Sequence, residues 1–325
     1  MHGRHLTIVD REVIFKMLAR GEGPKAIARA LQVHPATVRL ELDRNSQSDG
    51  EYFSSLAQAL ADERRRRSKA PWKMGQPRIA AYVQDRLQRY WSPQQIAGRM
   101  KLDHPDDPSM RISHACVYEG VYRLRANGKH WHRYLRQAHR KRRKRYGSGQ
   151  KRGRIVGRVG IEHRPAEVDA RTRFGDWESD TMEGAAHASY LATHVERKSR
   201  YLVMGRIADK RAATFNAGTI RAFARHEGLP RRTMTADNGK EFAAFAKLQR
   251  KLGLEVYFAD PYHSWQRGTN ENTNGLLRQF FPKGFDLRGA THRYVAHVER
   301  LLNARPRKCL GYRTPQEVLP APNGP

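Results

Sequence analysis

Apolar residues in the first fifty positions recur at the three- and four-residue spacing of helices that bury one face. The pattern predicts three short helices, over 10–20, 24–31 and 35–44. Asp10 can cap the first helix, and a tight turn at 32–33 joins the other two. This arrangement is typical of a helix-turn-helix, whose second helix enters the DNA major groove. We therefore expect Thr37, Arg39 and Arg44 to contact DNA, although an ordinary three-helix bundle shows the same periodicity.

The segment 51–76 is alanine-rich at its start and basic at its end, which predicts a helical linker. Four consecutive arginines in it are expected to follow a phosphate backbone. They are Arg64, Arg65, Arg66 and Arg67.

A second helical domain is predicted over 77–128, where apolar residues again keep helical spacing. Ser92 and Ser113 precede two of its helices as N-caps. A loop stands where a tight turn would be, so the segment resembles a second helix-turn-helix domain. A dimerisation or spacer bundle fits the same pattern nearly as well.

The pattern changes again in the second half of the chain. Frequent glycine among basic residues over 129–169 predicts a flexible linker. Beyond it, alternation predicts strands at 174–182, 190–195, 201–207, 232–235 and 254–258. Helices are expected at 212–224, 242–252, 265–280 and 294–302. A three-strand meander followed by alternating helices and strands predicts that 170–325 is an α/β RNase H-like domain with a mixed five-stranded sheet, preceded by all-α helix-turn-helix domains.

Charge indicates the partner. The chain has 62 lysines and arginines against 32 acids, a net charge of +30. This excess favours nucleic acid over an anionic membrane, because neither a basic amphipathic helix nor a lipidation site is evident. There is no acidic residue between Glu119 and Glu162. Within that gap, phosphate contacts are expected from Arg140, Lys141, Arg142, Arg143, Lys144 and Arg145.

Other features of the composition limit the cellular setting. Cys116 and Cys309 lie far apart and form no CxxC pair, which argues against a disulfide framework or a structural zinc site. No run approaches the roughly 18 apolar residues of a membrane span. The first ten residues carry no apolar signal region. A cytoplasmic protein with no membrane partner is therefore expected.

Three acids in the second half are candidates for chemistry. Asp180 lies on the first predicted strand, Asp237 ends the fourth, and Glu271 lies on a helix. In the predicted strand order the fourth strand lies beside the first, so these carboxylates can converge. Magnesium prefers such hard oxygen ligands, and two ions about 4 Å apart can cut and join phosphodiesters.

Each acid also has an ordinary structural explanation. Asp-Asn-Gly at 237–239 is a common turn, and Glu271 alone fits a surface helix charge. Asp180 is harder to dismiss because aspartate is disfavoured in strands. Asp176 and Glu178 share its face by alternation, however, so the strand alone does not select one of the three.

Longer runs resemble the DDE transposases of bacterial insertion sequences, specifically the IS-thirty family. The matching runs are GDWESD at 175–180, ERKSRY at 196–201, ADNGKEF at 236–242, FADPY at 258–262, SWQRGTNENTNG at 264–275, FPKG at 281–284 and NARPRKCLGYRTP at 303–315. The 33 residues between Asp237 and Glu271 match the family spacing. Family members usually have Gly-His-Trp-Glu-Gly-Asp at the first acid. Asp176 and Ser179 replace the His and Gly here, which leaves the role of Asp176 open.

The resemblance implies that Asp180, Asp237 and Glu271 are the catalytic, metal-binding triad. It implies two Mg²⁺ ions, with Mn²⁺ as a substitute, and places Arg278 towards DNA. Asn238, Asn270 and Asn274 would orient substrate or metal waters. His263 and Trp265 are ambiguous, since a tryptophan is more often core than a base-stacking platform.

The family also implies partners and a setting. The protein would bind the terminal inverted repeats of its own element, hydrolyse a phosphodiester at each end and join the 3′-hydroxyl to target DNA. Two ends must be held together, so at least a homodimer is expected, in the bacterial cytoplasm and associated with the nucleoid.

Three alternatives stay open at this point. A non-catalytic DNA-binding regulator explains the charge but not three acids at family spacing. A retroviral-type integrase or another RNase H-like nuclease shares the acids, but such integrases usually carry an amino-terminal His/Cys zinc unit. A degenerate copy that binds DNA without moving is a weaker possibility.

Overall fold

A computed structural model describes residues 5–68, 72–126, 128–136, 155, 157–185, 188–261 and 263–320. It divides into two compact units, Met1–Trp72 and Lys73–Pro325. The segments expected at 77–128 and 170–325 both fall in the second unit. The basic run at 140–145 lies outside the described residues. In the part of the chain that is described, each helix is too short or too polar to cross a lipid bilayer.

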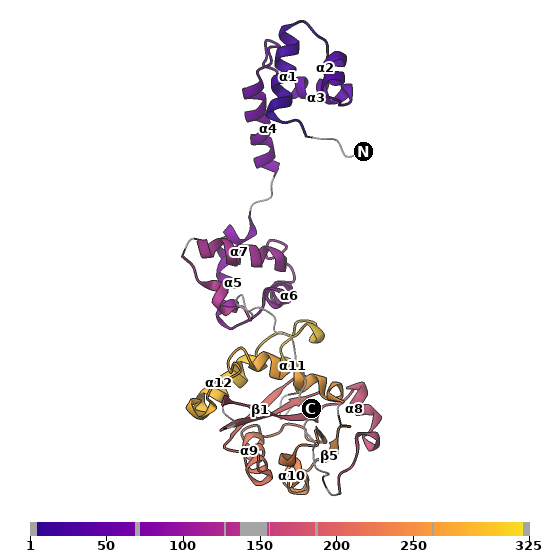
Figure 1. Cartoon of the computed structure of the whole chain (residues 1–325), viewed down its shortest axis with the longest axis vertical. Helices are drawn as coiled ribbons and strands as arrows, with labels where there is room; N and C mark the ends of the chain where they lie inside the picture. Colours follow the sequence, from indigo (N-terminus) through magenta and orange to yellow (C-terminus); the bar gives the residue numbers. More distant parts are fainter. Residues whose placement is uncertain are drawn as a thin grey trace. The chain divides into compact units, whose positions relative to one another are not determined.

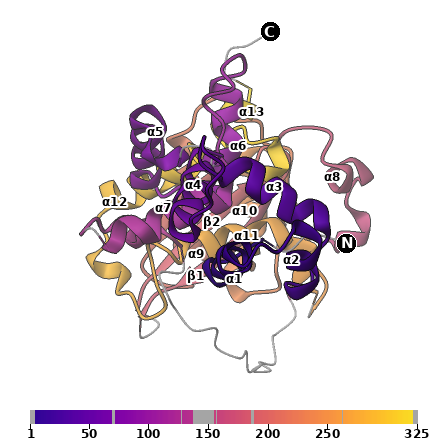
Figure 2. The same cartoon turned by 90° about the horizontal axis from the view of Figure 1, so that it is seen from above.

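The first unit is helical, and Figures 1 and 2 show its helices gathered into one body. They are α1 (Ile8–Ala19), α2 (Pro24–Ala30), α3 (Pro35–Asn45) and α4 (Ser54–Ser68). Ile14, Ile27 and Val38 form the centre of its core and are fully buried. The turn between α2 and α3 uses Gln32 with a left-handed φ of 54°. The three helices predicted for this region are therefore confirmed.

Two details of the first unit differ from expectation. Thr7, not Asp10, is the N-cap of α1, and Asp10 lies three residues on, where its carboxylate accepts a 2.7 Å hydrogen bond from the Thr7 amide. Helix α4, expected in a linker, packs on α1 and α3, and Ala57 is part of their core. The arginines at its end suggested an extended arm, but the apolar face of its first turns is enough to anchor it.

The second unit begins with a group of helices. They are α5 (Pro77–Gln88), α6 (Pro93–Asp103) and α7 (His114–Ala126). Ser92 caps α6 in a capping box with Gln95, and Ser113 accepts a hydrogen bond from the amide three residues on, so both predicted caps are confirmed. Arg99 on α6 makes a two-pronged ion pair with Glu317, at 2.6 and 2.7 Å. These helices therefore contact the carboxy-terminal segment of the chain.

A mixed five-stranded sheet forms the centre of the second unit. Its strands are β1 (Asp176–Glu183), β2 (Tyr190–Glu196), β3 (Leu202–Ile207), β4 (Thr233–Ala236) and β5 (Glu255–Phe258). Their order is β3-β2-β1-β4-β5, antiparallel among β1, β2 and β3 and parallel from β1 to β4 and β5. This is the expected RNase H-like arrangement. Because Glu178 pairs with Thr235 in the parallel register, Asp180 lies level with Asp237.

Helices cover both faces of the sheet, as Figure 1 shows. They are α9 (Ala212–Ala224) and α10 (Phe245–Leu252) on one face, and α11 (Gly268–Leu277) and α12 (His292–Asn303) on the other. The alternation of β1 sends Trp177 into the core under α9, whereas Met182 joins the core under α11 and α12. Glu178 and Asp180 therefore face the side on which α11 lies.

The segment before β1 was expected to be a flexible linker up to residue 169, and this is wrong for its described end. Ile155 is buried in the core under α9, and Gly160 forms a β-bridge with Phe258. Helix α8 (Ala166–Ala170) follows and buries Val168. The glycine and arginine content suggested flexibility, but two well-separated aliphatic side chains are enough to fix this segment to the sheet.

Candidate active site at strands β1 and β4

Asp180 and Asp237 converge on one guanidinium group. Arg267, at the residue before α11, lies 3.2 Å from an Asp180 oxygen and 3.5 Å from an Asp237 oxygen. The three side chains are 28%, 16% and 12% exposed for Asp180, Asp237 and Arg267 respectively, so the group is largely shielded but reachable from solvent. The prediction that the strand order brings these two aspartates together is confirmed.

Both aspartates are held by further hydrogen bonds. The Asn274 amide nitrogen donates to Asp180 at 3.0 Å, and the Thr181 backbone amide donates at 2.9 Å. Asp237 accepts a 2.8 Å bond from the Gly239 amide, which is the local turn that Asp-Asn-Gly favours. Burial raises the pKa of the Asp180 carboxyl above its ordinary range; the charge of Arg267 opposes this and that of Asp237 adds to it.

Glu271 is on the first turn of α11, and its residue is exposed. Within the described ranges, no group of three or more His, Cys, Asp or Glu side chains lies close enough together to hold a metal ion. The donor set of Asp180 and Asp237 suits a divalent cation, because these carboxylates already share a cationic group. The joining of Glu271 to them stays a prediction.

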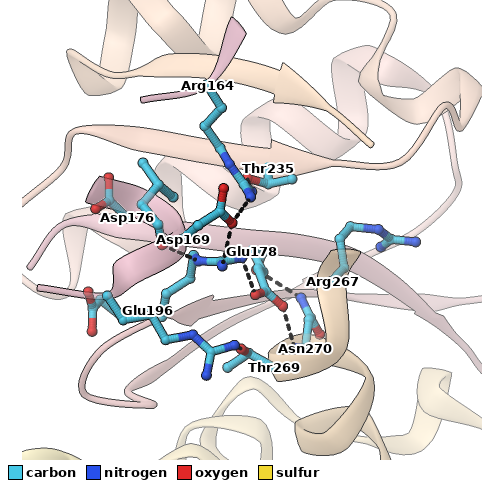
Figure 3. Close-up of polar contacts among 12 residues, drawn as sticks. Arg164, Asp169, Asp176, Glu178, Glu196, Thr235, Arg267, Thr269 and Asn270 are labelled. Atoms are coloured by element: carbon cyan, nitrogen blue, oxygen red, sulfur yellow. Dashed lines mark hydrogen bonds and ion pairs between the residues drawn. The ribbon is translucent and has the colours of Figure 1, made fainter. Parts of the chain in front are cut away.

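Glu178, two residues before Asp180, belongs to a different network, drawn in Figure 3. It is fully buried, pairs with Arg197 at 2.7 Å and accepts the Asn270 backbone amide at 2.8 Å. Arg197 also donates to Val168 at 3.0 Å and lies 3.3 Å from an Asp169 oxygen. Through these contacts, Glu178 and Arg197 connect α8, the β2–β3 turn and α11 to the sheet.

Asp176, whose role was open, is equally enclosed. It is 1% exposed, accepts the Thr233 hydroxyl at 2.8 Å and pairs with Arg173 at 3.1 Å. The three acids that share one face of β1 are therefore distinguished by exposure: Glu178 and Asp176 are enclosed, whereas Asp180 is 28% exposed.

The three asparagines expected beside the metal have different surroundings. Asn274 contacts Asp180 directly. Asn270 is fully buried, donates to the Glu178 and Thr193 carbonyls at 2.8 and 3.0 Å, and accepts the Thr193 hydroxyl. Asn238 donates to the Ala259 carbonyl at 2.7 Å and accepts from Arg158. Asn270 and Asn238 therefore hold protein segments together in this structure.

The expected DNA contacts also differ from one another. Arg39 and Arg44 are exposed on α3 and Thr37 is half-buried there. Arg278 donates to the Glu183 carbonyl at 3.1 Å, and burial lowers its pKa, so its guanidinium lies against the end of β1. The arginines of α4 are exposed, and three of them contact acids or an amide of the first unit: Arg64 with Asn45, Arg65 with Asp62, and Arg67 with Glu63.

Two features were not found by sequence reasoning. Arg267 has no pattern of its own, although its place in the Trp-Gln-Arg-Gly run four residues before Glu271 was a signal that could have been used. Trp265 is 68% exposed and stacks edge-on against His263 with ring centroids 4.3 Å apart. The usual expectation that a tryptophan is core is wrong here.

Comparison with known proteins agrees with this geometry. Residues 171–264 match the family model described as an integrase core domain, and residues 2–45 match one described as a helix-turn-helix domain. The chain is 38% identical to the transposase for insertion sequence element IS4351 of Bacteroides fragilis, covering 97% of this chain and 95% of that protein.

Two further relatives carry similar names. The transposase for IS1086 of Cupriavidus metallidurans is 37% identical, covering 91% of this chain and 88% of that protein. Transposase InsI for IS30A of Escherichia coli is 35% identical, covering 97% and 83%. Identity of this degree along nearly the whole length, together with the acidic motifs on β1, β4 and α11, shows that this chain belongs to the IS30 (IS-thirty) family of insertion-sequence transposases.

Proposed function

We propose that this transposase binds the terminal inverted repeats of its own insertion sequence, hydrolyses a phosphodiester at each end and joins the freed 3′-hydroxyl to target DNA with Mg²⁺. The supporting observation is the pair Asp180 and Asp237, whose carboxylates approach the guanidinium of Arg267 from two parallel strands. The relatives are named as transposases, and their names do not specify the metal or the DNA sequence.

Asp180, Asp237 and Glu271 would hold two Mg²⁺ ions, for which Mn²⁺ would substitute. When bound, such ions lower the pKa of an attacking hydroxyl and stabilise the charge of the leaving oxygen. Glu271 would approach the pair from the first turn of α11, whose N-cap is Arg267.

The chain's own residues prepare this site. Asn274 fixes one Asp180 oxygen through its hydrogen bond, and the Thr181 amide fixes the other, so the carboxylate cannot turn freely. Hydrogen bonds between Asn270 and Glu178 attach the start of α11 to β1. They thereby position the neighbouring residues Arg267 and Glu271 relative to the sheet. Arg267 offsets the repulsion between the two aspartates.

The helix-turn-helix of the first unit would recognise the repeats, with Thr37, Arg39 and Arg44 at the DNA. Two element ends must be cut and joined together, so we further propose a homodimer or larger assembly on DNA, acting at the nucleoid in the bacterial cytoplasm.

A cleavage assay on DNA carrying one element end tests the proposal. Wild-type protein should nick the end in Mg²⁺ or Mn²⁺ but not in EDTA, and paired ends should give strand-transfer products. Asp237→Asn and Glu271→Gln should bind the end as wild type does and leave it uncut. Normal cutting by either variant refutes its assignment, and end binding with no metal-dependent cutting by the wild type leaves only a DNA-binding regulator.

A further inference from the structure

Five arginines are buried among the described residues, and they divide into two groups. Arg11, Arg164 and Arg197 each form an ion pair with a carboxylate, as buried charges normally do. Arg305 and Arg307 do not. Within the described part of the chain, neither is within ion-pair distance of an acid. Two buried positive charges thus lack a negative partner.

The contacts of these two arginines are all neutral. Arg305 donates to the side-chain oxygens of Gln95 and Gln279, at 2.9 and 3.2 Å. Arg307 donates to the Leu302 carbonyl at 3.2 Å, and its buried Nε has no hydrogen-bond partner in the described structure. Neutral acceptors satisfy some N–H groups but leave the charge uncompensated.

Two more arginines meet beside them. Arg200 and Arg171 both donate to the Thr269 hydroxyl, at 2.8 and 3.4 Å. The buried Nε of Arg200 also lacks a partner among the described residues. Both have left-handed backbones, with φ of 65° and 54°.

Repulsion links the four guanidinium groups in order, Arg305 with Arg307, Arg307 with Arg200, and Arg200 with Arg171. Burial lowers the pKa of Arg305 to about 9, with Arg307 and Arg136 adding repulsion. Burial likewise lowers the pKa of Arg307 to about 10, and its neighbours include Arg200. Burial and then the charges of Arg200 and Arg197 lower the pKa of Arg171, and the charge of Glu178 opposes them. The cluster is therefore a site of high positive potential that an anion would stabilise.

The cluster lies at the start of the same helix that serves the aspartate pair. Thr269 and Asn274, whose side chain donates to Asp180, are five residues apart on α11, so their side chains leave the helix about 140° apart. Figure 3 shows Arg267 pointing away from Thr269. The aspartates therefore lie on one flank of α11 and the arginine cluster on the other. Arg136 lies against Gly275 of α11 and adds charge one turn beyond Glu271.

We propose that Arg171 and Arg200, backed by Arg307, bind a backbone phosphate of the DNA strand that crosses α11 to reach Asp180 and Asp237. Arginine forks fit a phosphate through two N–H groups each, and Thr269 holds both forks in place before DNA arrives. The assignment of the ligand as DNA rests on the proposed function. The inference that the cluster binds an anion is independent of that function.

The exposed Cys309 thiol offers a readout, since it acts electrostatically on both Arg171 and Arg307 and so lies near the cluster. Full-length protein in EDTA is treated with an alkylating reagent, with and without a duplex of the element end, and labelling at Cys309 is compared with that at Cys116. The test variant is Arg171→Gln/Arg200→Gln. The control, Arg221→Gln/Arg250→Gln, removes the same charge from exposed positions on α9 and α10, across the sheet.

We expect the duplex to protect Cys309 in the wild type and in the control, and not in the test variant. Anisotropy titrations should show about tenfold weaker DNA binding for the test variant than for the control. The slope of log K against log salt should fall by about 0.9, the value for one phosphate. Inorganic phosphate at the same phosphate concentration should not protect Cys309.

Equal behaviour of the two double variants overturns the proposal, as does a wild-type Cys309 that DNA leaves unprotected. Equal protection by inorganic phosphate overturns the assignment to DNA. Thermal melting of both variants checks that each is folded. Metal-dependent cleavage by the wild type is measured separately, so a failure of this site and a failure of the proposed enzyme activity give different results.

Discussion

Two neighbouring positions on one face of strand β1 hold carboxylates in opposite ways. At Glu178 the acid is fully buried and enclosed by Arg197 and the Asn270 amide. At Asp180, two residues on and on the same face, the acid is partly exposed and shares Arg267 with a second acid. The first arrangement satisfies a charge permanently. The second leaves two carboxylates and the guanidinium between them within reach of solvent, and a metal-dependent site requires carboxylates that a metal ion can reach.

The largest expected difference is in catalysis. Asp180→Asn removes a charge from the partly exposed position and should lower DNA-end cleavage at least about 10³-fold, as expected for a ligand of the reacting metals. Its thermal stability and end binding should stay near wild type. Single-turnover cleavage gives the rate, with Asp209→Asn, in the loop before α9, as control. Cleavage within tenfold of wild type would show that the comparison is wrong.

At the enclosed position, Glu178, substitution should lower the stability of the protein. Glu178→Gln leaves Arg197 buried with only the more distant Asp169 and should cost about 3 kcal/mol of unfolding free energy, since breaking a buried pair leaves an uncompensated charge. Urea unfolding followed by circular dichroism measures the loss. Glu167→Gln on α8, whose side chain is 63% exposed, serves as control and should change stability little. Equal effects of the two changes would contradict the network described for Glu178.

Arg267→Met tests whether this arginine occupies the place of a metal ion between Asp180 and Asp237. Without the Arg267 guanidinium the protein should lose about 1–2 kcal/mol of unfolding free energy in EDTA, a cost between those of breaking exposed and buried ion pairs. Added Mg²⁺ should then raise the melting temperature more in the variant than in the wild type, because metal stabilises the folded state that binds it. Differential scanning fluorimetry over a Mg²⁺ series measures this without DNA. An identical Mg²⁺ response in both proteins would mean that Arg267 does not stand in for the metal.

The smallest change in stability is expected at an ion pair away from β1. Hydrogen bonds from Arg99 lower the pKa of Glu317 to about 2, against the opposing effect of burial. A lowered pKa means that the pair stabilises the fold above the ordinary glutamate value and loses this as pH falls towards 2. Because the Glu317 side chain is 41% exposed, the contribution should be at most about 1 kcal/mol. The stability gap between wild type and Glu317→Gln should therefore shrink between pH 7 and pH 3, and a constant gap would exclude this origin.

Much of the site could be predicted from the chain because its determinants are local. Alternation gave the strands, their order placed Asp180 beside Asp237, and family spacing singled out Glu271. Alternation assigns a face, however, and not a partner. The partners that separate Glu178 from Asp180 come from Arg197 and Asn270, the latter 92 positions away in sequence. Such pairing depends on the folded backbone.

Where the structure differs from expectation, the causes are of the same kind. Asn270 was expected to orient substrate or metal waters because it neighbours Glu271; one residue turns a helix by about 100°, so its side chain points into the sheet, and its role at the metal stays a prediction. Residues 155–169 and helix α4 were assigned as linkers from composition. A few buried side chains, among them Ile155 and Ala57, outweigh many exposed basic ones when the chain chooses whether to pack.

Arg305 has one more consequence. Its guanidinium holds Gln95, on α6, and Gln279, just beyond the end of α11, at the same time. A displacement of α6 must therefore either break a hydrogen bond in a buried position or carry the end of α11 along. Any force that a bound partner exerts on the helices before the sheet thus has a short, stiff mechanical link to the helix that bears Glu271.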